Sequence, residues 1–203
     1  MSLASFRLPF LAAVSAILFS GCAGYPPTNP FFKPFGSWLN PKQTLEPPPV
    51  KSAESFWKGD GATGDPTIVI HRGDQRAYFY RGRKVVGASR ISSGKKGFTT
   101  PTGNYQVIQK DRHHVSTLYG DYVGADGVVV KANVDVGKDP APEGSTFSGA
   151  KMPYFLRFSG GYGLHAGRVP NYPASHGCVR LPAETARHFF ENAQMGTPVL
   201  VQE

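Results

Sequence analysis

From about residue 65 onward, the chain consists of short apolar, β-branched runs separated by glycine, proline and other turn residues. Such runs predict strands, here at residues 67–70, 77–80, 84–86, 104–108, 128–130, 154–158 and 198–201. The 24 glycines and 18 prolines among 203 residues disfavour a helical bundle and favour many strands joined by turns. We therefore expect a mostly β fold from residue 65 to residue 203.

Only one segment has a clear helical pattern. Pro182 suits a first helical position. The apolar residues that follow it have helical spacing: Ala186, Phe189, Phe190 and Ala193. Residues 111–150, by contrast, are rich in glycine and aspartate and have weak periodicity. We expect them to form a long loop region that could cover a substrate.

The N-terminal segment has the pattern of an export signal. Arg7 precedes an apolar run over residues 8–19, which is too short to span a membrane, and two small residues then lead to Cys22. Residues 19–22 resemble the lipobox of bacterial lipoproteins, which implies that Cys22 becomes a lipidated N-terminus. An ordinary signal peptide followed by a chance cysteine is the alternative.

Residues 22–64 are predicted to be a tether, because eight of the 18 prolines fall between Pro26 and Pro49. The predicted organisation is therefore a signal peptide (1–21), a lipidated tether (22–64) and a folded domain (65–203). This predicts an exported protein held by its lipid to a membrane that faces the cell wall. By resemblance, Ala23 implies the outer membrane if the cell is Gram-negative.

The residues that carry chemistry gather near the C-terminus, in the segments 163–167 and 175–180. If Cys22 carries a lipid, Cys178 has no disulfide partner in an oxidising compartment, so its thiol is expected to be buried or used. A nearby imidazole can take the proton of a thiol and activate it as a nucleophile. The backbone N–H groups of Gly177 and Cys178 could bind the oxyanion of a tetrahedral intermediate. This pattern indicates acyl transfer.

Two histidines could serve as the base. His176 lies two residues from Cys178, and His165 lies 13 positions before it on a predicted strand. Spacing does not separate them, and either could instead be a structural histidine. A zinc site formed by His165, His176 and Cys178 is a further alternative. No Asp or Glu occurs between Glu143 and Glu184 to support one. We therefore expect no metal and no other cofactor.

The run Ser-His-Gly-Cys-Val-Arg at 175–180, with His-x-Gly at 165–167, resembles the L,D-transpeptidase (YkuD-like) catalytic domain. Thr-Pro-Thr-Gly at 100–103 and Met-Pro-Tyr at 152–154 add to the resemblance, which spans residues 67–201. It implies a β-sandwich of mixed sheets, with one C-terminal helix after the nucleophile and the Pro-rich linker before the domain.

The resemblance also implies roles for individual residues. Cys178 would be the nucleophile and His165 its base, oriented by the backbone carbonyl of Ala166. The backbone N–H groups of His176, Gly177 and Cys178 would bind the oxyanion.

Three further residues are candidates for binding substrate: Arg180, Ser175 and Tyr154. The Arg180 guanidinium could hold a carboxylate in bidentate fashion. The ring of Tyr154 could equally belong to the core.

The implied substrate is a peptidoglycan stem peptide. Cys178 would form a thioester with a tetrapeptide stem, release D-Ala and pass the stem to an amine. The amine would belong to another stem, giving a 3→3 cross-link, or to a lipoprotein. An L,D-carboxypeptidase that uses water as acceptor is the main alternative. A non-catalytic lipoprotein that binds peptidoglycan is a more distant one.

The chain has a formal net charge of +8. Between Arg72 and Lys96, eight basic residues accompany one acidic residue, Asp74. Such a cluster could bind nucleic acid, face an anionic cell wall, or form a solvated strand face. Because export argues against nucleic acid, we expect none as a partner.

Overall fold

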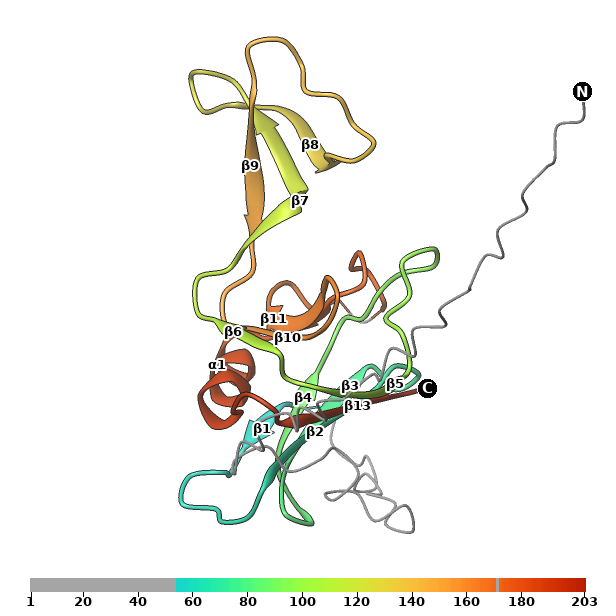
Figure 1. Cartoon of the computed structure of the whole chain (residues 1–203), viewed down its shortest axis with the longest axis vertical. Helices are drawn as coiled ribbons and strands as arrows, with labels where there is room; N and C mark the ends of the chain where they lie inside the picture. Colours follow the sequence, from blue (N-terminus) through green and yellow to red (C-terminus); the bar gives the residue numbers. More distant parts are fainter. Residues whose placement is uncertain (1–53, 171) are drawn as a thin grey trace, which may run out of the picture. The chain divides into compact units, whose positions relative to one another are not determined.

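Two β-sheets and one helix enclose the core of the structure (Figure 1). The computed structural model describes residues 54–170 and 172–203. The predicted signal peptide, Cys22 and most of the predicted tether lie outside these residues. Residues of both sheets and of the helix meet in one apolar cluster, so burial of this common core holds the sheets together.

The larger sheet has the strand order β1-β4-β3-β2-β13-β5. Its strands are β1 (Phe56–Trp57), β2 (Pro66–His71), β3 (Arg76–Arg81), β4 (Lys84–Arg90), β5 (Gly103–Gln106) and β13 (Pro198–Gln202). β13 lies parallel to β2 and antiparallel to β5. The last strand of the chain is therefore in the interior of the sheet.

The second sheet has the order β12-β11-β10-β6. It contains β6 (Gln109–Asp111), β10 (Phe155–Ser159), β11 (Tyr162–Ala166) and β12 (Val179–Leu181). β11 and β12 are parallel, and the other neighbours are antiparallel. Both sheets are mixed and the fold is mostly β, which confirms the predicted fold class.

The predicted strands 67–70, 77–80, 84–86 and 198–201 lie within β2, β3, β4 and β13. The turn between β3 and β4 is centred on Gly82, whose φ of 56° suits a residue without a side chain. β5 ends at Gln106, two residues before the predicted end, where Val107 leaves the strand and its N–H bonds to Thr197 instead.

The folded part begins earlier than the predicted boundary at residue 65. Trp57 of β1 stacks on His188 with ring centroids 4.9 Å apart and meets the edge of Phe79 at 5.4 Å. Its indole N–H donates to Asp60. The C-terminal end of the predicted tether is therefore part of the larger sheet. A two-residue strand is too short to produce a readable alternation.

α1 (Ala183–Asn192) follows β12 directly and confirms the predicted helix. Pro182 is the N-cap residue and not the first helical residue, because its ψ of 145° is extended. Phe189 meets Phe79 of the larger sheet edge-on at 5.3 Å, and Phe190 lies 5.8 Å from Tyr154, which directly precedes β10 of the second sheet. Among the described residues, no helix is long and apolar enough to cross a membrane.

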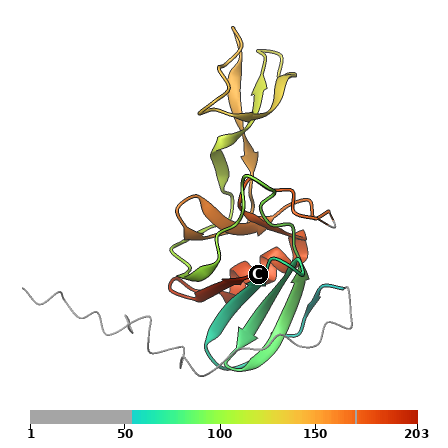
Figure 2. The same cartoon turned by 90° about the vertical axis from the view of Figure 1, so that its right-hand side faces the viewer.

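The prediction of a long loop over residues 111–150 is wrong. This segment forms a third sheet, in the order β8-β7-β9, from β7 (Val115–Val123), β8 (Val129–Asp135) and β9 (Thr146–Lys151). Figure 2 shows these strands set apart from the core. Most of their side chains are exposed or half-buried, so no core imposes an alternating pattern on the sequence.

Several of the eight basic residues between Arg72 and Lys96 have partners within the chain. Arg72 pairs with Glu203, Arg76 is buried and donates to the Glu54 carbonyl, and Arg81 donates to Asn192. These three guanidinium groups stabilise the fold, so the cluster is not one continuous free basic surface.

Candidate active site

Cys178 stands at the end of a tight loop that leads into β12. The loop turns at Gly177, whose φ is 115°. A Cβ at this position would lie 2.6 Å from the ring of Tyr162, so both the backbone angle and the space require glycine. The Cys178 thiol is partly buried and donates to the Gly161 carbonyl at 3.4 Å.

Ser175 holds this loop together from inside. Its buried hydroxyl accepts a hydrogen bond from the Gly177 N–H at 3.0 Å and donates to the Cys178 carbonyl. Two predictions change as a result. The Ser175 hydroxyl is engaged within the loop and does not face a substrate, and the Gly177 N–H already has a partner other than an oxyanion.

A second segment, residues 92–95, is hydrogen-bonded to the residues on both sides of the Cys178 loop. Ser92 exchanges two backbone hydrogen bonds with Arg180, and Lys95 N–H donates to the Ser175 carbonyl, all at 3.0 Å. Gly94 pairs with Ser175 as an isolated bridge. The loop that carries Cys178 is therefore paired at both of its ends, at Ser175 and at Arg180, with a segment 80 or more residues earlier in the chain.

We expect Gly94→Ala to destabilise the fold by about 1–3 kcal/mol, as overpacking in a tight site does. A Cβ at Gly94 would lie 1.9 Å from the Phe98 carbonyl oxygen and 2.8 Å from the Thr100 nitrogen. Gly161→Ala is the matched control, because no heavy atom lies within 4 Å of its Cβ position. Denaturant unfolding measures both variants. Equal stabilities would show that the support from residues 92–95 is not tight.

His165 lies on β11 and is buried. Its Nδ1 is 2.9 Å from the Ala166 carbonyl oxygen. A carbonyl can only accept, so Nδ1 carries the proton and Nε2 is the acceptor of the neutral ring. Burial is the main cause that lowers the pKa of His165 to about 4. The hydrogen bond to Ala166 opposes this shift, and Arg180 adds to it.

The Cys178 thiol is shifted in the opposite direction. Burial raises its pKa above the ordinary value, while a hydrogen bond from the Gly163 backbone and the charges of Arg157 and Arg180 act to lower it. With the imidazole pKa lowered and the thiol pKa raised, the neutral thiol and neutral imidazole are the stable pair at neutral pH. The site therefore does not rest as an ion pair.

The strand register brings these groups together. β11 and β12 run parallel, with His165 opposite Arg180 and Leu164 opposite Val179. Cys178 directly precedes Val179, the first residue of β12, so the loop that carries the thiol enters the strand next to the one that carries the imidazole. The half-buried Arg180 has its aliphatic stem over Gly167. Its charge affects the pKa of both Cys178 and His165.

The ring of His176 is held by aromatic neighbours. Tyr119 of β7 stacks on it at 4.7 Å with an interplanar angle of 13°, and Phe98 meets it edge-on at 4.7 Å. Burial raises the pKa of Tyr119, and Asp135 and Cys178 act in the same direction. The third sheet therefore reaches the site through Tyr119, a residue that sequence reasoning missed within its expected loop.

An aromatic column stands beside His165. His114 stacks on Phe155 at 4.2 Å, and the Phe155 ring lies 6.3 Å from that of His165. Asp111 Oδ2 lies 3.0 Å from His114 Nδ1. Through Phe155, the column links His114, which directly precedes β7, to the His165 ring.

The sequence left two roles open for Tyr154, substrate binding and the core, and the structure shows its ring in the core. Its ring packs against the core cluster, 5.8 Å from Phe190, and the Arg112 guanidinium lies 5.5 Å from its centroid. Its φ of 61° is unusual for a residue with a side chain. These contacts place Tyr154 with the core.

The residues of the zinc alternative do not form a ligand cluster. Within residues 54–170 and 172–203, no three His, Cys, Asp or Glu side chains gather closely enough to hold a metal ion. The reactive groups of the candidate site are therefore the Cys178 thiol, the His165 imidazole with its defined tautomer, and the Arg180 guanidinium.

The mixed sheets, the thiol of Cys178 just before β12 and the imidazole of His165 on the parallel strand β11 define a β-fold protein with a candidate cysteine–histidine site. The model of the L,D-transpeptidase catalytic domain family (YkuD) matches residues 65–201, and the chain belongs to this family.

Comparisons with individual proteins agree with this assignment. The YqjB protein of Bacillus subtilis is 23% identical over 145 residues, which cover 69% of this chain and 73% of that protein. An L,D-transpeptidase from Mycobacterium smegmatis has a TM-score of 0.52 at 19% identity and covers 68% of this chain and 59% of its own.

L,D-transpeptidase 3 from Mycobacterium tuberculosis, solved with a faropenem-derived adduct, has a TM-score of 0.52 at 21% identity and covers 68% of this chain. The chain spans about three-fifths of the length of these two solved structures. They share its fold.

Proposed function

We propose that this chain is a peptidoglycan L,D-transpeptidase with Cys178 as nucleophile and His165 as base. The observation that carries the proposal is the hydrogen bond between His165 Nδ1 and the Ala166 carbonyl. It leaves Nε2 unprotonated on the strand beside Cys178, where it can accept the thiol proton. Membership of the L,D-transpeptidase family supports the choice of substrate.

The first half-reaction forms a thioester. Cys178 Sγ attacks the carbonyl between the third residue of a tetrapeptide stem and the terminal D-Ala, while His165 Nε2 takes the thiol proton. The C–N bond then breaks, and the His165 imidazolium gives its proton to the departing D-Ala amine. Since the pKa of His165 is about 4, its imidazolium is a strong acid for this step.

The second half-reaction transfers the stem. An acceptor amine attacks the thioester carbonyl and His165 takes the amine proton; the C–S bond then breaks, and His165 returns the proton to the departing Cys178 thiolate. With an amine from another stem the product is a 3→3 cross-link, with a lipoprotein amine it is an anchored protein, and with water it is a shortened stem. Arg180, beside both reacting groups, is the proposed partner of a substrate carboxylate.

The proposal is tested by incubating the purified chain with a muropeptide that carries a tetrapeptide stem. We expect intact-mass spectra to show an adduct of the stem without its D-Ala, and free D-Ala to appear in solution. Product analysis with and without an amine acceptor separates transpeptidase from carboxypeptidase. Absence of both the adduct and D-Ala release would overturn the proposal in favour of a non-catalytic binding protein.

We also propose that the chain is exported and lipid-anchored through Cys22, on the support of the lipobox-like sequence and the proline-rich segment after it. We expect Cys22→Ala to move the chain from the membrane fraction to the soluble fraction. Retention of the variant in the membrane fraction would contradict this proposal.

A further inference from the structure

Thr100, the first residue of the Thr-Pro-Thr-Gly segment, packs against residues 175–178, the loop that carries the proposed nucleophile and is called the nucleophile loop below. Its side chain is completely buried. Its hydroxyl accepts a hydrogen bond from the Gly94 N–H at 3.0 Å and donates to the Gly177 carbonyl at 2.7 Å. Because a hydroxyl has a single hydrogen, its one donor is committed to Gly177.

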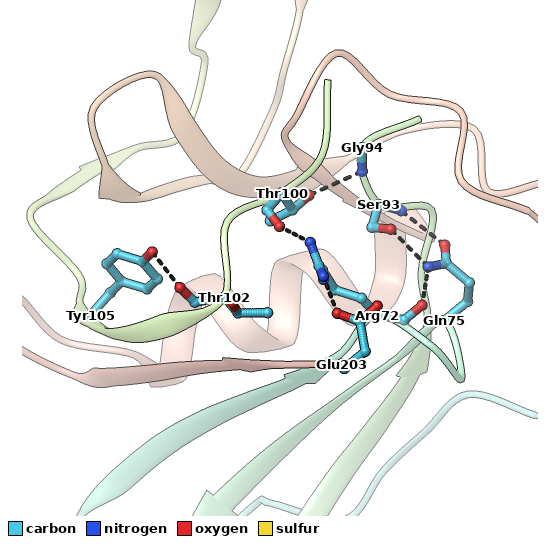
Figure 3. Close-up of polar contacts among 8 residues, drawn as sticks. All are labelled: Arg72, Gln75, Ser93, Gly94, Thr100, Thr102, Tyr105 and Glu203. Atoms are coloured by element: carbon cyan, nitrogen blue, oxygen red, sulfur yellow. Dashed lines mark hydrogen bonds and ion pairs between the residues drawn. The ribbon is translucent and has the colours of Figure 1, made fainter. Parts of the chain in front are cut away.

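The position of Thr100 is itself braced from the other side. Arg72 donates to the Thr100 carbonyl and pairs with Glu203 near the end of the chain (Figure 3). Gln75 donates to the Arg72 carbonyl and to the Ser93 hydroxyl, and Ser93 N–H donates back to Gln75. The threonine hydroxyl is therefore held in place by contacts that do not involve the nucleophile loop.

The Thr100–Gly177 bond fixes the orientation of a whole peptide unit. The peptide between Gly177 and Cys178 is planar and trans, so its C=O and N–H point in opposite directions. When the Gly177 carbonyl points at Thr100, the Cys178 N–H points to the opposite side. Rotation of this peptide would move the N–H without moving the thiol by a comparable distance.

The neighbouring peptide is oriented differently. The Gly177 N–H donates to the Ser175 hydroxyl within the loop. The Cys178 N–H differs from it, because the direction of this N–H is set by Thr100, a residue outside the loop.

We infer that Thr100 is a positioning residue that aims the Cys178 N–H at the oxyanion of the tetrahedral intermediate. This inference rests on the proposed function and adds to it a residue that does not touch the substrate. It assigns a physical task to the first threonine of the segment: the hydroxyl fixes the nucleophile's own peptide. The second threonine, Thr102, is exposed, and its carbonyl accepts from Tyr105.

The test compares two reactions of the same thiol. Iodoacetamide forms an S–C bond and releases iodide without creating an oxyanion, so it reports the thiol and its base. Acylation by a carbapenem or by the tetrapeptide stem passes through a tetrahedral oxyanion and needs the aimed donor. We expect Thr100→Val to slow acylation about 10²-fold, the lower end of the loss of an oxyanion donor, and to leave the alkylation rate unchanged.

Thr100→Ser keeps the hydroxyl and is expected to restore acylation. Thr102→Val is the matched control from the same segment and is expected to acylate like the wild type. Thr100→Ala is the second variant if valine prevents folding, since it removes the hydroxyl without adding apolar bulk. Thermal unfolding establishes that each variant is folded before the rates are compared.

Wild-type acylation in Thr100→Val and Thr100→Ala would overturn the inference. It would also be overturned if alkylation and acylation slowed together, because Thr100 would then hold the thiol or the fold in general. A wild-type chain that reacts with the carbapenem but not with the stem overturns the proposed function and leaves the ratio of rates as a valid test of Thr100. A wild-type chain that reacts with neither overturns both.

Discussion

Cys178→Ala is expected to abolish the stem adduct and D-Ala release, a loss of about 10⁴-fold or more in rate, as for other covalent nucleophiles. Alanine cannot form the thioester, and neither an aimed backbone N–H nor a bound substrate can replace the missing sulfur. The measurement is intact-mass spectrometry of the chain after exposure to the muropeptide, together with an assay of free D-Ala.

A carbapenem provides an independent probe of the same thiol, because its strained ring presents an acyl group to the nucleophile. Cys22→Ala is the matched control, since Cys22 and Cys178 are the chain's two cysteines. It is expected to keep the adduct. An adduct on Cys178→Ala, or a peptide map that places the wild-type adduct on another residue, contradicts the assignment of the nucleophile.

His165→Gln is expected to lower the acylation rate by about 10²–10⁴-fold, the usual contribution of general acid–base catalysis. The resting pair is neutral, since burial lowers the pKa of His165 and raises that of Cys178. The thiol must therefore lose its proton during attack, and Nε2 of His165 is the proposed acceptor. Single-turnover acylation by a carbapenem measures this step.

The pH dependence of the acylation rate tests the same assignment in a second way. In the wild type, the rate falls only as the pH drops through about 4, where His165 becomes protonated and can no longer accept a proton. In His165→Gln this acid limb is expected to disappear. The rate should instead rise with pH as the thiol ionises, above the ordinary thiol range because burial raises the pKa of Cys178.

His176→Gln serves as the comparison, because its ring stacks on Tyr119 and lies edge-on to Phe98. We expect a smaller loss than in His165→Gln and a retained acid limb. If His176→Gln instead caused the larger loss and removed the limb, His176 would be the base.

Much of the fold could be predicted because its core is ordered by simple periodicities. β2, β3 and β13 are buried over most of their length and appear in the sequence as short apolar runs. The helix after β12 was predicted because Ala186, Phe189 and Phe190 bury one side of it. In these elements a buried face selects the apolar residues, so the pattern can be read directly.

Most of the third sheet could not be predicted in this way, because its strands lack such a buried face. β7 and β8 carry exposed apolar residues such as Leu118 and Val129. Their pairing also shifts register at several points. The run at residues 128–130 did predict a strand, and it overlaps the start of β8. Without a buried face and with an irregular ladder, neither composition nor alternation distinguished β7, β9 and the rest of β8 from a loop. The stacking of Tyr119 on His176 depends on that sheet and could not be predicted.

The candidate site divides in the same way. The sequence by itself determined which groups are predicted to carry the chemistry: a thiol after a glycine, two nearby histidines and an arginine, in an order that resembles one family. These features can be recognised from the sequence because they depend on the type and order of neighbouring residues, and not on how distant segments pack.

Only the tertiary structure decided what each neighbouring group does. It committed Ser175 and the Gly177 N–H to the inside of the loop, put Tyr154 with the core, and brought Thr100 beneath Gly177. The physical reason is that a hydroxyl or an amide has few hydrogen bonds to give, and its partner is set by which distant segments pack together. Sequence spacing cannot show that choice.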